Sequence, residues 1–542
     1  MKIAAIEEAF EPSVDGKCAY AEGGMVATAF PEATRAGVEM LEQGGNAIDA
    51  ACAASLALSV CEPQASGIGG QSMAILNING RTIALDGSSR VPSLAHLSQF
   101  NENERLVGYK ATTVPSTIAV LGHLNRRYGR LKWSTLFEPA IRIAKEGYRI
   151  TELQNKLQTR ELEKFKKVPK GSGARYFLKD NSLPFAPGDL FCQSDLGNLL
   201  ETLADQGPMA FYRGEIARQI DEDMRAHGGF LRYDDLALIP HPIERRPIRR
   251  RFRGMDVYTI PPPAAGRTLL LVLRILNHIP SKFLRSEEPE TYHFMAEAFR
   301  KAFLLRTQRP YDPNTYPQVS DKKMLSRSMA KSLAISIRDI IDHQLPMIEP
   351  PVDEGETTHL SVMDSEGNAI GITQSVEFVY GSKTAAEGLG FLYNSYMNAF
   401  DIQNAAHPYY LRPNAIPWTT VAPAIVMHRN KPWLLIGSPG SERIYSTISQ
   451  FLVNMIDKHM PLCKAMYHPR LHCSIGGTIN LEGERFDPGL VKYLEEMGYR
   501  IKIREPYSFY LGAVHAVMNC QSLPGFQGVA EVRRDGSAEG PN

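Results

Sequence analysis

The spacing of apolar residues along the chain alternates between a helical and a strand-like period, which predicts a mixed α/β protein. A run of small and apolar residues follows Asn46 in "NAIDAACAASLALSV" and predicts a helix that Asn46 caps. A second helix is predicted in "WSTLFEPAIRIAKEGYRI" (133–150) and ends at Gly147. The run "LLLVLRILNHI" (269–279) fits a buried helix or a buried strand, because periodicity alone does not separate the two.

Turn residues between alternating apolar positions predict where the strands lie. Asn79-Gly80, between two β-rich runs, is a strong hairpin signal. The chain is mostly helical in pattern from 281 to 350, and the Pro- and acid-rich segment "QLPMIEPPVDEGE" (344–356) is the best linker candidate. A β-rich half follows this segment, with strands expected at 357–375, within 422–441 and near 510–535.

The stretch "TTHLSVMDSEGNAIGITQS" (357–375) predicts a tight β-hairpin. Gly367 supplies the left-handed conformation that its short turn needs. With the turn at this place, Thr357 faces Ser375 across the two strands. Two hydroxyl side chains then lie within hydrogen-bond reach of each other at the mouth of the hairpin.

A threonine hydroxyl at the start of a strand has two interpretations. It is a weak nucleophile unless a base lies beside it, and the residues nearby show no Ser-His-Asp spacing. If the chain were cut before Thr357, however, the freed α-amino group would be such a base, because its pKa lies near neutrality. The alternative is that these threonines serve only the β propensity of the strand.

A glycine-containing loop follows a predicted strand in "PWLLIGSPGSERIYSTISQ" (432–450). It leads into an amphipathic helix expected to begin at about Ile444. Backbone N–H groups at such a helix start can hold an anion and can form an oxyanion hole. Gly440 would permit close approach of the backbone, although a strand, loop and helix of this kind is by itself a weak signal.

Composition and charge exclude some classes of partner. The 542 residues are 43% hydrophobic and 22% charged, which is typical of a globular protein. Because 60 Lys and Arg balance 59 Asp and Glu, the net charge of +1 indicates neither a nucleic acid nor a membrane as a partner. The basic cluster "RRPIRRRFRG" (245–254) favours a solvated strand edge over a phosphate site.

The N-terminus and the cysteines predict a cytoplasmic protein. Glu7, Glu8 and Glu11 lie where a secretory signal would carry its apolar core, so no signal peptide is expected. No stretch reaches the apolar length of a membrane span. The seven cysteines are scattered without C-x-x-C spacing, which predicts free thiols in a reducing compartment.

Several segments resemble one family in the same order nearly from end to end. They are "GMVATAFPEATRAGVEMLEQGGNAIDAACAASLALSVCEPQASGIGGQ" (24–71), "PPPAAG" (261–266), "TTHLSVMDSEGNAIGITQS" (357–375), "GSPGSERI" (437–444) and "VRRDGSAEG" (532–540). In these segments the chain resembles γ-glutamyltransferases. The resemblance implies an α+β fold, the four-layer αββα sandwich of N-terminal-nucleophile hydrolases. It also implies a proenzyme that cuts itself between Glu356 and Thr357 into a large subunit (1–356) and a small subunit (357–542), which stay interlaced as a heterodimer; further dimerisation is left open.

The same resemblance assigns the catalytic residues. Thr357 would be the nucleophile and, through its freed amine, the base. Ser375 stands where the family has a second supporting hydroxyl, and the backbone N–H groups of Gly440 and Ser441 occupy the oxyanion position. No metal and no cofactor is expected, and the partner is a small-molecule amide or acyl substrate, not a nucleic acid or a membrane.

The positions that would bind the acyl group depart from the family pattern. Glu377 replaces an Asn, Tyr396 replaces one member of a polar pair, and Thr419-Thr420 replaces a serine pair. Arg90 is displaced by two residues from the expected arginine. Because a zwitterion needs charged partners when it is desolvated, these changes predict an acyl group other than a plain γ-glutamyl one.

The favoured function is therefore a self-processing hydrolase or acyltransferase that forms an acyl-enzyme on Thr357 and cleaves a small-molecule amide. Three alternatives stay open: a genuine γ-glutamyl hydrolase or transferase for glutathione-like substrates, a carbon–carbon bond hydrolase of a biosynthetic pathway, and an uncleaved binding protein without catalysis. A denaturing gel separates the last alternative from the others, because an uncleaved protein gives one band.

Overall fold

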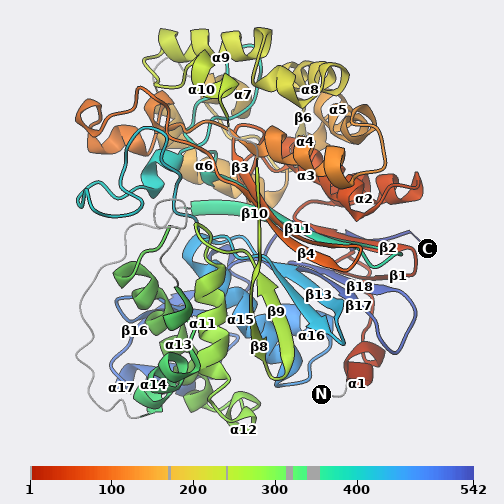
Figure 1. The fold of residues 1–542 in the computed structure, drawn as a ribbon, viewed down its shortest axis with the longest axis vertical. Coiled ribbons are helices and arrows are strands. Elements are labelled where there is room, and N and C mark those ends of the chain that lie inside the picture. Colours follow the sequence, from red (N-terminus) through yellow and green to blue (C-terminus); the bar gives the residue numbers. More distant parts are fainter. Residues whose placement is uncertain (1–2, 169–171, 240–241, 313–320, 339–354, 542) are drawn as a thin grey trace.

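The computed structural model describes residues 3–168, 172–239, 242–312, 321–338 and 355–541. Two seven-stranded antiparallel sheets lie face to face between two layers of helices (Figure 1). This is the predicted α+β four-layer sandwich, and the prediction of the fold class is confirmed. The candidate linker falls largely on 339–354, outside the described residues.

The upper sheet of Figure 1 contains the predicted hairpin at its centre. Its strands, in spatial order, are β19 (Ser537–Glu539), β2 (Gly24–Thr28), β10 (Gly355–Asp364), β11 (Ala369–Phe378), β3 (Gln71–Ile78), β4 (Arg81–Gly87) and β7 (Ile243–Arg245). Asn79 and Gly80, both with positive φ, form the turn between β3 and β4, as predicted.

The lower sheet carries the strand that leads into the glycine loop. Its strands, in spatial order, are β1 (Cys18–Ala21), β18 (Phe526–Ala530), β17 (His515–Asn519), β13 (Lys431–Gly437), β12 (Ala424–His428), β9 (Met255–Thr259) and β8 (Ile248–Phe252). Both sheets therefore combine strands from either side of the 356/357 junction, so the two parts of the chain share one core.

Helices cover the outer face of each sheet (Figure 1). The upper layer holds α2 (Pro31–Glu42), α3 (Ala47–Cys61), α4 (Thr117–Tyr128), α5 (Glu138–Glu146), α6 (Glu152–Lys166), α7 (Ser172–Phe177), α8 (Ser194–Gln206), α9 (Glu215–Ala226) and α10 (Tyr233–Ala237). The lower layer holds α11 (Gly266–Leu276), α12 (Ser281–Leu284), α13 (Pro289–Gln308), α14 (Arg327–Arg338), α15 (Ile444–Ile456), α16 (Leu462–Tyr467) and α17 (Pro488–Glu496). The short α1 (Ile3–Glu8) lies near the N-terminus, and smaller sheets are formed by β5 (Tyr148–Arg149) with β6 (Leu190–Phe191) and by β14 (Leu471–Cys473), β15 (Thr478–Glu482) and β16 (Arg500–Arg504).

The helices confirm most of the local predictions. Asn46 caps α3 with its side chain, and α3 is buried along its whole length between the upper sheet and other helices. Gly147, with φ of +84°, ends α5. The ambiguous run at 269–279 belongs mainly to α11, since its apolar residues are buried on nearly all sides of a helix that lies between the lower sheet and α13. In the described part of the chain, no helix is long and apolar enough to cross a membrane.

The prediction of free thiols is wrong for two of the seven cysteines. Cys18 in β1 forms a disulfide with Cys463 in α16, whereas Cys52, Cys61, Cys192, Cys473 and Cys520 are free. The two partners are far apart in sequence and lie on opposite sides of the 356/357 junction, a pairing that spacing alone could not indicate. The bond thus links the two parts of the chain covalently, and the cytoplasmic location stays a prediction.

Candidate active site

Thr357 lies at a β-bulge in the centre of the molecule. Glu356 pairs with Glu377 and Thr358 pairs with Gln374, so Thr357 alone stands opposite two residues, Ser375 and Val376. The pairs from Thr358–Gln374 to Met363–Ala369 follow the predicted register. A bulge bends the strand and releases one residue from the ladder of hydrogen bonds. Thr357, only 5% exposed, is therefore set apart from the regular strand at the position where the cut is expected.

Ser375 contacts the peptide group that precedes Thr357. Its Oγ donates a hydrogen bond of 2.6 Å to the carbonyl oxygen of Glu356 and accepts one of 2.8 Å from the backbone N–H of Glu377. The second hydrogen bond fixes the hydroxyl, and the first polarises the carbonyl that Thr357 would attack. The predicted direct pairing of Thr357 with Ser375 is therefore displaced by the bulge, and the Ser375 hydroxyl is directed at the carbonyl before Thr357.

A buried ion pair holds the side chain of Glu356. Its Oε1 accepts a hydrogen bond of 2.5 Å from Nη2 of Arg534 and one of 2.9 Å from the backbone N–H of Thr357. The guanidinium of Arg534 lies 3.9 Å from the ring centroid of Phe509, and its Nη1 lies 3.7 Å from Oε1 of Glu62. These contacts orient the residue before the junction on both its backbone and its side chain.

This environment changes the pKa of the Glu62 carboxyl. Burial raises the pKa of its carboxyl to about 8, although the charge of Arg534 opposes the rise. Glu62 directly follows the last residue of α3. An acidic residue immediately after a long apolar helix is the sequence signal that could have indicated Glu62 as a site residue. Arg534 lies within "VRRDGSAEG" and was part of the resemblance, but sequence reasoning assigned it no role.

The glycine loop brings backbone N–H groups beside the strand that carries Thr357. Gly440 ends the loop after β13 with φ of +118°, and the turn η9 (Ser441–Arg443), which contacts β10, leads into α15. A side chain at Gly440 would place its Cβ 3.0 Å from Cα of Gly512, so the close approach requires glycine. Within the described chain, the N–H groups of Gly440 and Ser441 have no hydrogen-bond acceptor, which leaves them available to an oxyanion.

A cavity of about 420 Å³ joins the junction to this turn. Gly355 and Glu356 line it on one side, and Arg443 at the end of η9 lines it on another. Phe509 and further cationic side chains complete its wall. A small molecule in this cavity would lie beside the Glu356–Thr357 peptide group.

Two of the predicted substrate-binding residues, Glu377 and Tyr396, lie next to Ser375. Burial raises the pKa of the Tyr396 phenol, and the nearby Glu377 carboxyl adds to this rise. Hydrogen bonding of the phenol to Ser375 and Gln71 opposes it. Burial raises the pKa of Glu377 to about 8, and its backbone φ is +78°, a strained conformation for a residue other than glycine. At neutral pH this carboxyl is therefore largely protonated. Sequence reasoning missed Gln71.

Arg90, Thr419 and Thr420 are not joined to this cluster by any described contact. Nη1 of Arg90 donates to the carbonyl oxygen of Asn414 at 3.2 Å, and its side chain lines a separate small cavity. The carbonyl oxygen of Thr419 accepts a hydrogen bond of 2.6 Å from Nη2 of Arg306, and Thr420 is half-buried. Of the five predicted substrate residues, only Glu377 and Tyr396 thus contact the junction cluster.

Arg306 and Glu442 form a second charged environment at the turn η9. Burial raises the pKa of Glu442 to about 7, and the charge of Arg306 acts against this rise. Burial lowers the pKa of Arg306 to about 10. Neither residue was predicted, although Glu442 directly follows the glycine loop in the sequence.

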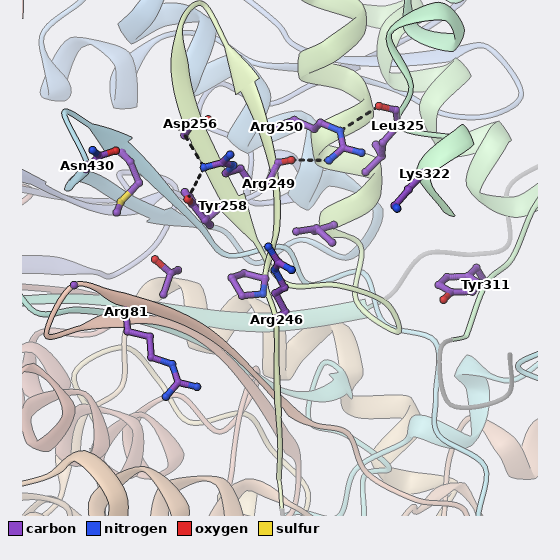
Figure 2. Close-up of a pocket in the computed structure, with 15 residues that line it drawn as sticks. Arg81, Arg246, Arg249, Arg250, Asp256, Tyr258, Tyr311, Lys322, Leu325 and Asn430 are labelled. Atoms are coloured by element: carbon purple, nitrogen blue, oxygen red, sulfur yellow. Dashed lines mark hydrogen bonds and ion pairs between the residues drawn. The ribbon is translucent and has the colours of Figure 1, made fainter. Parts of the chain in front are cut away.

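The basic cluster at 245–254 is a strand edge, as expected. β8 is the outermost strand of the lower sheet, and its Arg249 and Arg250 line an open cleft of about 950 Å³ together with Arg81 and Arg246 (Figure 2). Their guanidinium groups are directed to different places: Arg249 toward Tyr258, and Arg250 toward the carbonyl oxygen of Leu325 (Figure 2). Such charges protect an edge strand from pairing with other chains.

In the part of the chain that the structure describes, no group of three His, Cys, Asp or Glu residues could hold a metal ion.

Comparison with known proteins identifies what this arrangement is similar to. The family model described as gamma-glutamyltranspeptidase matches residues 33–540. The glutathione hydrolase proenzyme of Escherichia coli (strain K12) is 31% identical over 524 residues, which cover 92% of this chain and 88% of that protein. The acylase ACY 1 proenzyme of Pseudomonas sp. (strain SE83) is 30% identical over 510 residues, which cover 90% of this chain and 89% of that protein.

A solved structure has the same architecture over the whole length. The crystal structure of cephalosporin acylase from Bacillus halodurans aligns with a TM-score of 0.88 at 26% identity and covers 98% of both chains. The relatives thus include proteins named as glutathione hydrolases and proteins named as acylases, and the match extends across both sides of the 356/357 junction.

Proposed function

Because the chain belongs to the gamma-glutamyltranspeptidase family, we propose that Thr357 cuts its own chain and then works as the nucleophile of an amide hydrolase or acyltransferase. Enzymes of this family are N-terminal-nucleophile hydrolases that act on amide bonds, and this chain is one of them. The observation that carries the proposal is the hydrogen bond of 2.6 Å from Ser375 to the carbonyl oxygen of Glu356, the group that must be activated for the cut.

In the self-cleavage that we propose, Oγ of Thr357 attacks the carbonyl carbon of Glu356. The carbonyl oxygen gains negative charge against the hydroxyl of Ser375, and the C–N bond breaks as the nitrogen of Thr357 takes up the hydroxyl proton. An ester then joins Glu356 to Oγ of Thr357. One water molecule hydrolyses this ester, which leaves a carboxylate on residue 356 and a free α-amino group and hydroxyl on Thr357.

The freed amine provides the base for turnover. It takes the proton from Oγ of Thr357 as Oγ attacks the substrate carbonyl, whose developing charge faces the N–H groups of Gly440 and Ser441. The proton passes to the leaving nitrogen, and an acyl-enzyme remains on Thr357. Water or an acceptor amine releases the acyl group, which gives hydrolysis or transfer. The large subunit (1–356) and the small subunit (357–542) stay together because both sheets contain strands from each.

We propose an acyl group without the zwitterionic head of a γ-glutamyl group. A buried ammonium needs an anionic partner, but the Glu377 carboxyl has its pKa raised to about 8 and is largely neutral at pH 7. A buried carboxylate needs a cation, but Arg90 is directed to the carbonyl oxygen of Asn414 instead. Two relatives are named acylases, which supports the same choice.

The test compares two anilides with acyl chains of equal length, L-γ-glutamyl-4-nitroanilide and glutaryl-4-nitroanilide. Processed protein should release 4-nitroaniline from the glutaryl compound at the higher kcat/KM, because that acyl group has no ammonium to desolvate. A higher kcat/KM for the γ-glutamyl compound would contradict this assignment and would show that the protein is a genuine γ-glutamyl enzyme. If fully processed protein cleaves neither compound, its acyl group is neither a γ-glutamyl nor a glutaryl group.

A further inference from the structure

The open cleft of about 950 Å³ lies at the edge that the two sheets share (Figure 2). β7 is the last strand of the upper sheet and β8 is the last strand of the lower sheet, and the chain crosses between them at Arg246 and Pro247. The turn between β3 and β4 lines the cleft from the upper sheet, and β8 and β9 line it from the lower sheet. None of its lining residues lines the cavity beside Thr357, so the proposed function does not use this space.

The charged side chains that line this cleft are mostly cations. Its one acidic residue is Asp256, whose Oδ2 lies 3.8 Å from Nη1 of Arg249 and whose Oδ1 lies 3.3 Å from Nε of Arg251, outside the cleft. Glu244, which precedes the crossing between the sheets, is paired with Arg127. The lining therefore carries an excess of positive charge, which comes from five side chains: Arg81, Arg246, Arg249, Arg250 and Lys322.

Three of these arginines have no carboxylate partner. Within the described chain, the side chains of Arg81 and Arg246 form no hydrogen bond and no ion pair. Arg250 donates only to carbonyl oxygens, from Nε to Leu325 at 3.1 Å and from Nη1 to Arg249 at 2.7 Å. These two carbonyl groups orient its guanidinium but do not neutralise its charge. The three guanidinium groups thus keep N–H groups available to an anion from outside.

An arginine behind the cleft shows that its charge is not balanced from the interior of the protein. Arg274 lies on α11, which packs against β8, and its Nε is buried without an acceptor among the described residues. Burial lowers the pKa of Arg274, and the positive charges of Arg250 and Arg327 lower it further. The neighbouring charges that act on this guanidinium are therefore positive as well.

We propose that this cleft binds a small molecule that carries linked phosphate groups. The protection of an edge strand accounts for the arginines of β8, but Arg81, Arg246 and Lys322 lie outside β8 and line the same space. Guanidinium groups pair with phosphate through two parallel hydrogen bonds, and a group of cations matches a ligand with several negative charges. The volume of about 950 Å³ lies within the usual range for small-molecule sites.

Calorimetry with tripolyphosphate on the Thr357→Ala protein tests this proposal independently of self-cleavage and turnover. Tripolyphosphate should bind, and its affinity should fall as the salt concentration rises, because salt screens the charges of an open cleft. Orthophosphate and citrate should each bind at least ~10-fold more weakly, because the first carries fewer charges and the second carries carboxylates. Absence of tripolyphosphate binding at low salt would overturn the proposal, and equal affinity for citrate would overturn the assignment to phosphate.

The double variant Arg81→Gln/Arg246→Gln locates the binding site. It removes two cations that make no described side-chain contact, so the fold should persist, and the affinity for tripolyphosphate should fall at least ~10-fold. Arg35→Gln/Arg126→Gln is the matched control, because both residues are exposed on helices without a described partner, and its affinity should stay within ~2-fold of the parent protein. Equal affinities of the two double variants would overturn the proposal.

ATP without a divalent cation distinguishes the two sources of linked phosphates. A higher affinity for ATP than for tripolyphosphate would identify a nucleotide as the ligand, because the base then adds to binding. A lower affinity would identify an inorganic phosphate chain. Both results support a phosphate-binding cleft if Arg81→Gln/Arg246→Gln weakens them, and an ATP affinity that this variant leaves unchanged would contradict the nucleotide assignment.

Discussion

The two sides of Thr357 differ in which of their polar groups are paired. On the junction side, Ser375 holds the Glu356 carbonyl and Arg534 holds the Glu356 carboxylate, each through a short hydrogen bond. On the substrate side, burial raises the pKa of Glu377 to about 8 and that of Glu442 to about 7. The protein thus provides partners for its own peptide group but leaves acids without full counter-charges where a substrate would bind.

This difference follows from what each side has to recognise. The junction is one fixed peptide group, so its partners can be arranged during folding and cost no reorganisation at the cut. A substrate arrives later and brings its own polar groups, so partners on that side stay unsatisfied until it binds. Changes on the junction side should therefore affect self-cleavage first, and changes on the substrate side should affect turnover first.

The largest effect is expected from Ser375→Ala. This change removes the hydrogen-bond donor of the Glu356 carbonyl, and losing one such donor typically slows a reaction by about 10²–10³. The rate at which the full-length band disappears on a reducing gel measures it. Ser375→Thr should restore self-cleavage, and Ser449→Ala, which removes a buried serine hydrogen bond in α15, should leave it unchanged. Similar rates for Ser375→Ala and the wild type would disprove the role of the hydroxyl.

A smaller effect, on turnover alone, is expected from Gly440→Ala. The added Cβ would lie 3.0 Å from Cα of Gly512 and would displace the N–H groups of the oxyanion turn. The kcat of processed protein should fall roughly 10- to 100-fold, while the rate of self-cleavage should change little. Gly80→Ala is the matched control, because Gly80 also has a positive φ but has open space around it. Equal losses in both reactions would show that the two sides are not separable.

A still smaller effect, on stability, is expected from Glu377→Gln. The folded pKa of about 8 lies above the ordinary value, so the folded protein binds this proton more tightly than the unfolded chain. The resulting stability is fully present at acid pH and is lost as the pH rises toward 8. The variant should therefore gain ~1–3 kcal/mol relative to the wild type between pH 5 and 8.5. Urea unfolding at several pH values measures this, with exposed Glu495→Gln as control; parallel pH profiles would contradict the shifted pKa.

The smallest effect on catalysis is expected from Cys18→Ser, which removes the disulfide to Cys463. Turnover should stay within ~2-fold of the wild type, because the bond lies at the edge of the lower sheet and away from Thr357. Processed wild-type protein should run as one band without reductant and as two bands with it. The processed variant should give two bands under both conditions. Two bands from unreduced wild type would show that the disulfide does not form.

The sequence predicted the elements whose signals are local. The cap at Asn46, the turn at Asn79-Gly80 and the end of α5 at Gly147 each depend on a few adjacent residues, and the structure contains all three. The hairpin register from Thr358 to Met363 also followed from its turn. The four-layer architecture came from the resemblance, because pattern alone does not order fourteen strands into two sheets.

Contacts between distant parts of the chain could not be predicted in this way. Arg534 reaches Glu356, and Cys18 reaches Cys463, across more than a hundred residues of sequence. The bulge at Thr357 also escaped prediction, because no glycine or proline marks it. Arg90 was placed by counting along a motif, but the direction of its side chain depends on Asn414, a residue far along the chain.

The central claim is that the hydroxyl of Thr357 cuts the peptide bond before it. Mass spectrometry of reduced protein tests this most directly, by comparing the wild type with Thr357→Ala after equal incubation. The wild type should yield fragments 1–356 and 357–542, the second with threonine at its N-terminus, and the variant should keep the intact mass of 60.3 kDa less the small change of the substitution. The same two fragments from the variant, or an intact wild type, would contradict the account.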